Sequence, residues 1–318
     1  MKVLITGGAG FIGANLVRRL ETMADIAEIV VIDDLSFGFR ENLDDTSATL
    51  LEGSILDEQL LRHATDGAST IVHLAARSSV PRSVAEPMAT HEVNATGTAL
   101  VLEAARRAGD VQVIVASSSS VYGSTDVLPK HEGLAARPIS PYAASKLATE
   151  SYALAWGHSY GLPVLALRLF NVFGPLQPPA HTYAAVIPAF LAAACSDRPL
   201  PVHGDGTQCR DFTFVGSVVD VLGQAITRRV NYPDPVNLAF GTRVTLLEVV
   251  AELEHILERR LPVDHMPTRV GDVRRSQADS SLLLELFPDL EPTKLADGLR
   301  ATVEWFERAR PWEHPASV

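Results

Sequence analysis

A tyrosine and a lysine four residues apart have the clearest chemical potential in this sequence. Tyr142 and Lys146 follow Pro141, where a helix can begin, and this spacing places both side chains on one helical face. A phenol has an ordinary pKa of about 10, so it is a poor base at neutral pH. A nearby positive charge would stabilise the phenolate and lower that pKa. The pair therefore suits proton abstraction, although a surface Tyr and Lys on a helix is the alternative.

A serine-rich segment offers a hydroxyl for the same site. Residues 116–123 read ASSSSVYG and follow a buried apolar run, so Ser118 is expected where a parallel strand ends. Ligand sites in doubly wound sheets lie at these carboxyl ends. Ser118 could bridge a substrate oxygen and Tyr142, whereas Ser119 and Ser120 are expected to be turn residues. A strand end, a serine and the Tyr/Lys helix together indicate alcohol chemistry far more specifically than any one of them.

A glycine-rich turn near the amino terminus predicts a dinucleotide site. Gly7, Gly10 and Gly13 depart from the usual G-x-G-x-x-G spacing, but they suit the same mechanics. The first glycine permits a tight turn, the second lets the backbone approach a pyrophosphate, and the third lets the helix pack closely on the sheet. The amino terminus of that helix would face the phosphates with free N–H groups and a partial positive charge.

An acid after the second apolar run indicates which dinucleotide is bound. Asp33 lies about 20 residues after Gly13, and a carboxylate there can accept hydrogen bonds from the adenosine ribose. It would also repel a 2′-phosphate, so NAD is favoured over NADP. The alternative is that Asp33 caps the turn before Leu35 and Ser36. An oxidised nicotinamide would then supply a positive charge beside Tyr142.

Apolar runs alternate with helical patterns along the first half of the chain. Strands without polar alternation, separated by helices, predict a parallel sheet covered on both faces, which right-handed crossovers make doubly wound. The expected class is α/β, a Rossmann lobe with a second, smaller mixed α/β substrate lobe. Strands are expected at 3–5, 29–32, 49–51, 70–74, 111–115 and 164–169, and helices at 11–23, 93–108 and 143–158.

The sequence changes in character after Phe173. Residues 174–183, GPLQPPAHTY, are too rich in proline for a central strand or helix. We therefore assign residues 1–173 to the NAD-binding lobe, with part of 211–240 returning to complete it, and 174–318 mainly to the substrate lobe. Further helices are expected at 187–195, 217–229, 246–259 and 295–308.

Composition limits the partners and the compartment. Among 318 residues, 38 Asp and Glu outnumber 27 Lys and Arg, and a net charge of -11 argues against binding nucleic acid. No apolar run approaches the roughly 20 residues of a membrane helix. Cys195 and Cys209 are too few for a disulfide scaffold or a thiolate metal cage, so a cytoplasmic protein without a metal is expected.

Ordered motifs over nearly the whole chain resemble those of extended short-chain dehydrogenase/reductases. The resemblance is to the NAD-dependent nucleotide-sugar epimerase/dehydratase family, and more narrowly to UDP-glucose/UDP-N-acetylglucosamine 4-epimerases. It implies a Rossmann lobe, NAD, a UDP-sugar substrate, and a homodimer formed through the helices near 93–108 and 143–158. The motifs are TGGAGFIG, HLAARSSVPRSV, SSSSVYG, PISPYAASK, LRLFNVFGP, YAAVIP, GDGTQCRDFTFV and RVGDVRRSQAD.

The resemblance also implies individual roles. Tyr142 would be the base, Lys146 would hold the nicotinamide ribose, and Ser118 would lie beside the sugar 4-hydroxyl. Two guanidinium groups, those of Arg210 and Arg269, are what a diphosphate needs in an acidic protein, with surface ion pairing as the alternative for each. Further cofactor contacts are implied at Phe11, Ile12, Ile55, Leu74, Ala75 and Ala76, and further substrate contacts at Ser78, Asn171, Val186, His203, Asp272 and Ser276.

Departures from the family patterns separate the candidate reactions. Related sugar 4,6-dehydratases carry an Asp–Glu pair where Ser119 and Ser120 stand, and hydroxyls are too weakly acidic and basic for that work. Glucuronate 4-epimerases usually have Thr at the position of Asn171. Ser276 stands where strict glucose/galactose epimerases hold a bulky Tyr, so a 2-acetamido group has room. These departures favour a neutral hexose with or without an N-acetyl group.

The sequence therefore predicts NAD-dependent inversion at C4 of a UDP-hexose through a transient 4-keto sugar. Ser54 replaces an aspartate often found near adenine, and His203 replaces an aromatic residue that often stacks on uracil, so another base remains open. The alternatives are a UDP-glucuronate 4-epimerase, a sugar-nucleotide dehydratase, a 3,5- or 2-epimerase, and a non-catalytic NAD-sensing protein. A sensor would not need Tyr142 and Lys146 in register.

Overall fold

Seven parallel strands form the main sheet of the computed structural model, which describes residues 1–179, 185–268 and 276–313. The strands are β1 (Lys2–Thr6), β2 (Glu28–Asp33), β3 (Thr49–Glu52), β4 (Thr70–His73), β5 (Gln112–Ser118), β6 (Val164–Leu169) and β11 (Val236–Leu238). Their order is β11-β6-β5-β4-β1-β2-β3. The order changes direction between β1 and β4, so the carboxyl ends of these two strands border the crevice where doubly wound sheets bind ligands.

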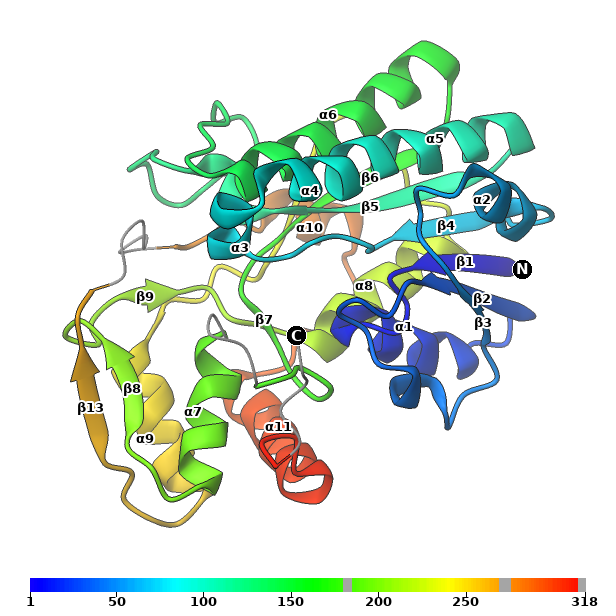
Figure 1. The fold of residues 1–318 in the computed structure, drawn as a ribbon. Helices are drawn as coiled ribbons and strands as arrows, with labels where there is room; N and C mark the ends of the chain where they lie inside the picture. Colours follow the sequence, from blue (N-terminus) through cyan, green and yellow to red (C-terminus); the bar gives the residue numbers. More distant parts are fainter. Residues whose placement is uncertain (180–184, 269–275, 314–318) are drawn as a thin grey trace.

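Helices cover both faces of this sheet, which confirms the doubly wound α/β class. On one face lie α2 (Glu58–Thr65), α5 (Gly97–Ala108) and α6 (Pro141–Tyr160), and Figure 1 shows α5 and α6 side by side. On the other lie α1 (Phe11–Glu21) and α8 (Val215–Thr227), which share an apolar core with β1. Strand β4 is buried at every position, as expected for a strand covered on both sides.

The connection between β4 and α5 differs from the expected single helix over 93–108. Two short helices come first, α3 (Val80–Ala85) and α4 (Pro87–His91), followed by a π-helical segment over Glu92–Thr96. The long helix α5 begins only at Gly97. A π-helical segment of one turn inside a helix often marks a functional site, and this one turns Asn94 towards the residues that follow β4.

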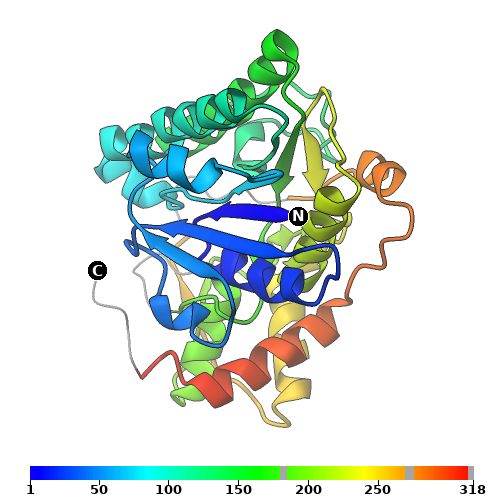
Figure 2. The same cartoon turned by 90° about the vertical axis from the view of Figure 1, so that its right-hand side faces the viewer.

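The second lobe has a core of its own, built around Phe173, Phe190 and Phe306. Figure 2 shows its last helix, α11 (Leu295–Ala309), at the opposite end of the molecule from α6. Among the described residues no helix is both long and apolar enough to cross a membrane. The remaining elements are β7 (Val172–Phe173), α7 (Val186–Cys195), β8 (Leu200–His203), β9 (Cys209–Arg210), β10 (Thr213–Phe214), β12 (Val244–Thr245), α9 (Leu246–Ile256), β13 (Val263–Met266), α10 (Ser281–Leu286) and α11 (Leu295–Ala309), with 3₁₀ turns at Arg40–Leu43 and Ser119–Tyr122.

Two elements from the second half of the chain return to the first sheet. Strand β11 pairs in parallel with β6, and α8 packs on α1, where Arg19 Nε donates to Asp220 Oδ1 at 2.6 Å. The helix expected at 217–229 begins two residues earlier, at Val215, and packs with α1 on the main sheet, within the segment 211–240 that was expected to return to the first lobe.

Candidate functional site

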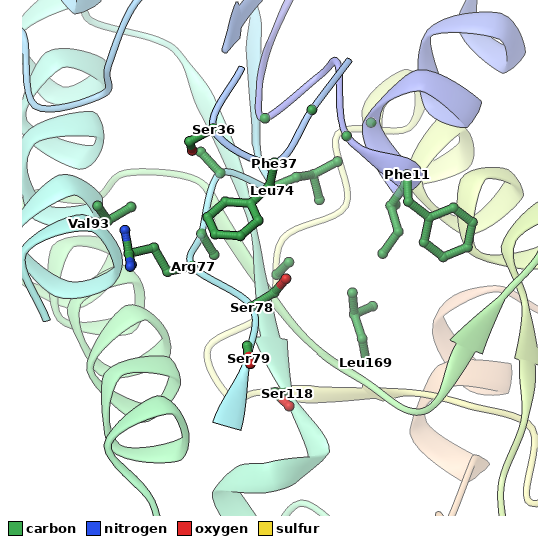
Figure 3. A pocket seen from close by; sticks show the side chains of 18 of the residues that line it. Phe11, Ser36, Phe37, Leu74, Arg77, Ser78, Ser79, Val93, Ser118 and Leu169 are labelled. Carbon is green, nitrogen blue, oxygen red and sulfur yellow. The ribbon is translucent and has the colours of Figure 1, made fainter. Parts of the chain in front are cut away.

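A pocket of about 630 Å³ lies at the carboxyl ends of the central strands, and most of the predicted site residues line it. Figure 3 shows Ser78, Ser79 and Ser118 in succession along it, with Phe37 and Leu74 beyond Ser78. The predicted residues that line the pocket are Gly7, Gly10, Phe11, Ile12, Gly13, Asp33, Ile55, Leu74, Ala75, Ala76, Ser78, Ser118, Tyr142, Lys146 and Asn171.

The glycine turn after β1 has no room for a side chain at Gly7 or at Gly13. Gly7 has φ +74°, and a Cβ there would lie 2.6 Å from the backbone nitrogen of Ala75. A Cβ on Gly13 would lie 2.3 Å from the carbonyl oxygen of Gly7. Gly13 is thus required for packing of α1 against the glycine turn itself, rather than against the sheet as expected. Gly10 caps α1 without a side-chain hydrogen bond, so the first turn of that helix borders the pocket directly.

Asp33 serves the structure as well as lining the pocket. Its Oδ2 accepts a hydrogen bond from Ala9 N at 2.9 Å, and its Oδ1 accepts one from Leu35 N at 2.9 Å. Burial raises the pKa of Asp33, and the backbone hydrogen bonds from Leu35 and Ala9 oppose that rise. The carboxylate therefore ties the glycine turn to the end of β2 and caps the turn at Leu35 while its edge remains part of the pocket wall.

The phenol of Tyr142 and the hydroxyl of Ser118 meet where α6 begins beside the end of β5. Ser140 caps α6 by accepting a hydrogen bond from Ala143 N at 3.1 Å, and Pro141 occupies the first turn. Burial raises the pKa of Tyr142, and a side-chain hydrogen bond with Ser118 partly offsets the rise. The pKa of Tyr142 is therefore raised, not lowered as expected from a nearby positive charge, because burial has the largest effect on it.

Lys146 is buried beneath the pocket, with only 5% of its surface exposed. Its Nζ donates to the carbonyl oxygen of Ala116 at 2.8 Å, and burial lowers the pKa of Lys146 to about 8. His73 is also buried, and burial together with the Lys146 charge lowers the pKa of His73 to about 3. The ring is therefore neutral at pH 7 and hydrogen bonds to Thr6 at 2.7 Å and Thr98 at 3.0 Å. Lys146 is the cationic side chain beside Tyr142.

Four further predicted substrate residues, Val186, His203, Arg210 and Ser276, lie in the second lobe and do not line this pocket. Val186 begins α7, next to Ala185 in the pocket wall. The His203 ring hydrogen bonds through Nδ1 with the carbonyl oxygen of Pro267 at 2.9 Å. Arg210 and Ser276 both bind the backbone of Cys209. The Cys209 carbonyl oxygen accepts a hydrogen bond from Arg210 Nη1 at 2.9 Å and another from Ser276 N at 3.1 Å. Arg269 and Asp272 lie outside the described residues.

Comparison with known proteins identifies the family to which this chain belongs. Residues 3–239 match the NAD dependent epimerase/dehydratase family. The chain belongs to this family. A UDP-glucose 4-epimerase of Mycolicibacterium smegmatis is 35% identical over 96% of this chain and 98% of its own. A dTDP-glucose 4,6-dehydratase of Streptomyces niveus is 31% identical over 99% of this chain and 95% of its own.

A solved member of the family superposes closely on this structure. It is the UDP-N-acetylglucosamine 4-epimerase from Methanobrevibacter ruminantium in complex with UDP-N-acetylmuramic acid, with a TM-score of 0.91 and 35% identity over 97% of this chain and 98% of the other. The family therefore fixes the fold and the class of chemistry, while its members divide between epimerases and dehydratases.

In the present protein, the segments that follow β2 and β4 contribute pocket residues that the sequence analysis missed. Phe37 follows β2, and the guanidinium carbon of Arg82 lies 4.3 Å from its ring centroid. Arg77 lies 5.9 Å from the same centroid, and its side chain pairs with Glu86. Two guanidinium groups at one pocket suit a phosphate-bearing ligand. Their presence in the HLAARSSVPRSV motif was the available signal. The missed residues include Asp34, Ser36, Phe37, Ser79, Arg77, Arg82 and Gln177.

Proposed function

We propose that this protein inverts C4 of a UDP-hexose, glucose/galactose and also the N-acetylated pair, by reversible oxidation to a 4-keto sugar. The observation that supports this most directly is that Ser118, Tyr142, Lys146 and the glycine turn line one pocket, with the Ser118 hydroxyl close enough to the Tyr142 phenol to lower its pKa. The similarity to two 4-epimerases, one acting on UDP-glucose and one on UDP-N-acetylglucosamine by their names, points the same way.

The pocket residues fit a dinucleotide cofactor. Gly7, Gly10 and Gly13 line the pocket beside the first turn of α1, so backbone N–H groups at the amino terminus of this helix would face a pyrophosphate. Asp33 would accept hydrogen bonds from the hydroxyls of the adenosine ribose. Lys146 would donate a hydrogen bond to the nicotinamide ribose. The apolar wall would be formed by Phe11, Ile12, Ile55, Leu74, Ala75 and Ala76. NAD bound there supplies a hydride acceptor for C4 and later a hydride donor.

The protein's own groups manage the proton. Tyr142 would remove the proton of the sugar 4-hydroxyl, and Ser118 would hold that oxygen in line with the phenol. Because burial raises the pKa of Tyr142, positive charge is required to make the phenolate accessible near neutral pH. The Lys146 ammonium provides one such charge and the oxidised cofactor another. The same phenol would return its proton when the 4-keto sugar is reduced.

Inversion requires that the sugar present its other face while the nucleotide stays bound. We propose that the second lobe holds the nucleotide and diphosphate, so that the sugar can turn about the diphosphate linkage between the two hydride transfers. Asn171 connects the lobes, since its Nδ2 donates to the carbonyl oxygen of Asp211 at 3.0 Å. The proposed substrate contacts are Ser78, Asn171, Val186, His203, Arg210, Arg269, Asp272 and Ser276.

A dehydratase is the main alternative, because a dehydratase is among the relatives. Positions 119 and 120 carry hydroxyls, and Ser120 Oγ donates to Ser118 Oγ at 2.9 Å. Ser120 therefore orients the catalytic serine instead of supplying an acid for elimination at C5 and C6. This arrangement favours the epimerase.

The test is incubation with UDP-glucose, UDP-galactose and their N-acetyl forms, followed by chromatographic separation of the epimers. Interconversion of at least one pair, without net consumption of NAD, is the expected result. Absence of interconversion in every pair would contradict the proposal. A 4-keto-6-deoxy product would instead establish the dehydratase, and turnover of UDP-glucuronate alone would establish the acidic-sugar epimerase.

We further propose that the protein is a homodimer through α5 and α6. Tyr152, Trp156 and Tyr160 form an aromatic stripe on α6, with ring centroids 5.9 and 5.7 Å apart. Tyr152 is 39% exposed and Tyr160 57% exposed. A second copy packing along this helix pair would cover the stripe, since aromatic surfaces are favoured at the centres of interfaces.

A further inference from the structure

An ion pair lies buried directly behind the proposed catalytic residues and has no part in the mechanism above. Glu150 and Arg168 are each 3% exposed. Arg168 Nε donates to Glu150 Oε2 at 2.9 Å, and Arg168 Nη2 donates to Oε1 at 2.6 Å. Removing two charges from water is costly, and a buried ion pair is weak grounds for stability. Its two parallel hydrogen bonds do, however, fix the geometry of both side chains.

The end of β5 is fastened to α6 at three successive residues. The Ala116 carbonyl oxygen accepts from Lys146 Nζ at 2.8 Å. Ser117 Oγ donates to Glu150 Oε2 at 2.8 Å. Ser118 and Tyr142 line the same pocket, and the Ser118 hydroxyl lies close enough to the phenol to lower the pKa of Tyr142. Glu150 follows Lys146 by one helical turn on α6. Its carboxylate holds Ser117, which lies between Ala116, the residue bound by Lys146, and Ser118, the residue beside Tyr142.

Arg168 holds the turn on the other side of Ser118. It lies on β6 opposite Ser117 in the strand register. Its guanidinium carbon lies 4.7 Å from the ring centroid of Tyr122, the last residue of the 3₁₀ turn after Ser118. The Tyr122 hydroxyl in turn donates to Asn237 Oδ1 on β11 at 2.6 Å. The pair therefore fastens the chain both before and after Ser118.

We propose that Glu150 and Arg168 are positioning residues that hold the Ser118 hydroxyl against the Tyr142 phenol through Ser117. The proposal rests on the proposed function only in taking Ser118 and Tyr142 as the reacting pair. Neither Glu150 nor Arg168 lines the pocket. Because their charges oppose each other, the pair fixes geometry without placing a net charge beside Lys146.

Ser117 gives the cleanest test, because Glu150→Ala would leave a buried guanidinium unpaired and endanger the fold. Ser117→Ala cuts the link to β5 and leaves the ion pair in place. Ser217→Ala is the control for loss of a buried serine hydroxyl: Ser217 is 1% exposed against 2% for Ser117, and its Oγ accepts a hydrogen bond from Thr293 N at 2.9 Å. Ser117 lines the pocket and Ser217 does not, so the Ser118–Tyr142 separation in the crystal structures, rather than kcat alone, decides the role. Ser117→Thr keeps the hydroxyl, and Arg168→Lys keeps the charge but loses the two parallel bonds.

The measurements are kcat, KM, melting temperature and crystal structures of the NAD-loaded variants. Misplacement of a reacting group lowers kcat, so Ser117→Ala should lose about tenfold in kcat with KM within about twofold. Ser117→Thr should recover most of this, Arg168→Lys should lose an intermediate amount, and Ser217→Ala should keep kcat despite a similar change in melting temperature. The Ser118 Oγ–Tyr142 Oη separation should lengthen in Ser117→Ala and not in Ser217→Ala.

Two results would overturn the positioning role. One is an unchanged Ser118–Tyr142 separation in Ser117→Ala, and the other is an equal loss of kcat in the two alanine variants. If the wild-type protein converts none of the UDP-hexoses, the proposed function fails, while the measured separation still decides the role of Glu150 and Arg168.

Discussion

The proposed base Tyr142 and the ammonium of Lys146 are both buried, and burial acts against the charged form of each. Burial raises the pKa of Tyr142 and lowers that of Lys146, so it disfavours the phenolate and the ammonium alike. The spacing of these residues predicted their common helical face. It could not predict the balance, because burial depends on strands and helices that are distant in the sequence.

Replacing the base gives the first prediction. Tyr142→Phe keeps the ring and removes the hydroxyl, so it should retain bound NAD and lose at least about a hundredfold in kcat. NAD released on denaturation and epimer interconversion are the two measurements. Activity near that of the wild type would show that another group is the base.

The buried lysine gives a prediction about stability and pH. Because the pKa of Lys146 is lowered from 10.5 to about 8, the unfolded chain binds more protons than the folded one between these values. Stability should therefore rise with pH across that window, by up to about 3 kcal/mol for this group. Below pH 8 the full penalty of a buried ammonium remains. Denaturant unfolding of the wild type and Lys146→Met at pH 7.5 and 10 measures the difference, and parallel pH profiles would contradict it.

At the scale of elements, the strands of the first half of the chain and the longer helices that bury an apolar face were predictable, whereas the connections and the later strands, β11 among them, were not. Apolar runs located β1, β2, β3, β4 and β6 to within one residue at each end, and β5 ended three residues later than expected. The short helix α2 was missed because it spans only Glu58–Thr65 and depends on its cap, in which Asp57 accepts from Gln59 N and Leu60 N. The π-helical segment was missed because Asn94 there is set by tertiary contacts, donating to Ser145 Oγ at 2.9 Å and accepting from Arg77 N at 2.7 Å.

The glycine turn gives the third prediction. In Gly13→Ala the new Cβ would lie 2.3 Å from Gly7 O, so α1 must shift away from the turn. The variant should lose most of its bound NAD and melt at a lower temperature. Gly133→Ala is the control, since its nearest contact is a His131 side-chain atom at 3.3 Å. Equal NAD content in the two variants would show that the close packing of Gly13 is not needed.

At the scale of the whole molecule, the sequence could show that the cofactor residues share a site, but not which segments of the second lobe meet. The cofactor residues cluster because strand order and crossover handedness bring the strand ends together, and this much follows from the pattern. Arg210 and Ser276 meet through Cys209, a contact between segments separated by long and irregular connections. Glu150 and Arg168 were overlooked for the same reason: each is an ordinary charged residue in sequence and acquires its partner only in the fold.

The aromatic stripe on α6 gives the fourth prediction. Tyr152→Glu combined with Tyr160→Glu places carboxylates at the centre of the proposed dimer interface, where burying unpaired charge is costly. The double variant should sediment as a monomer when the wild type sediments as a dimer. Leu247→Glu is the control, because Leu247 is 42% exposed and lies on α9, away from the stripe. A wild-type monomer, or an unaffected dimer in the double variant, would contradict the proposed interface.

The late return of α8 and β11 has a consequence for how the protein is made. When a ribosome has released only the first 173 residues, the sheet lacks the strand that pairs with β6, and the apolar face of α1 lacks the helix that covers it. The seven-stranded sheet of the NAD-binding half can therefore be completed only after residues up to Leu238 have emerged from the ribosome. Until then it exposes an open strand edge of the kind that chaperones shield.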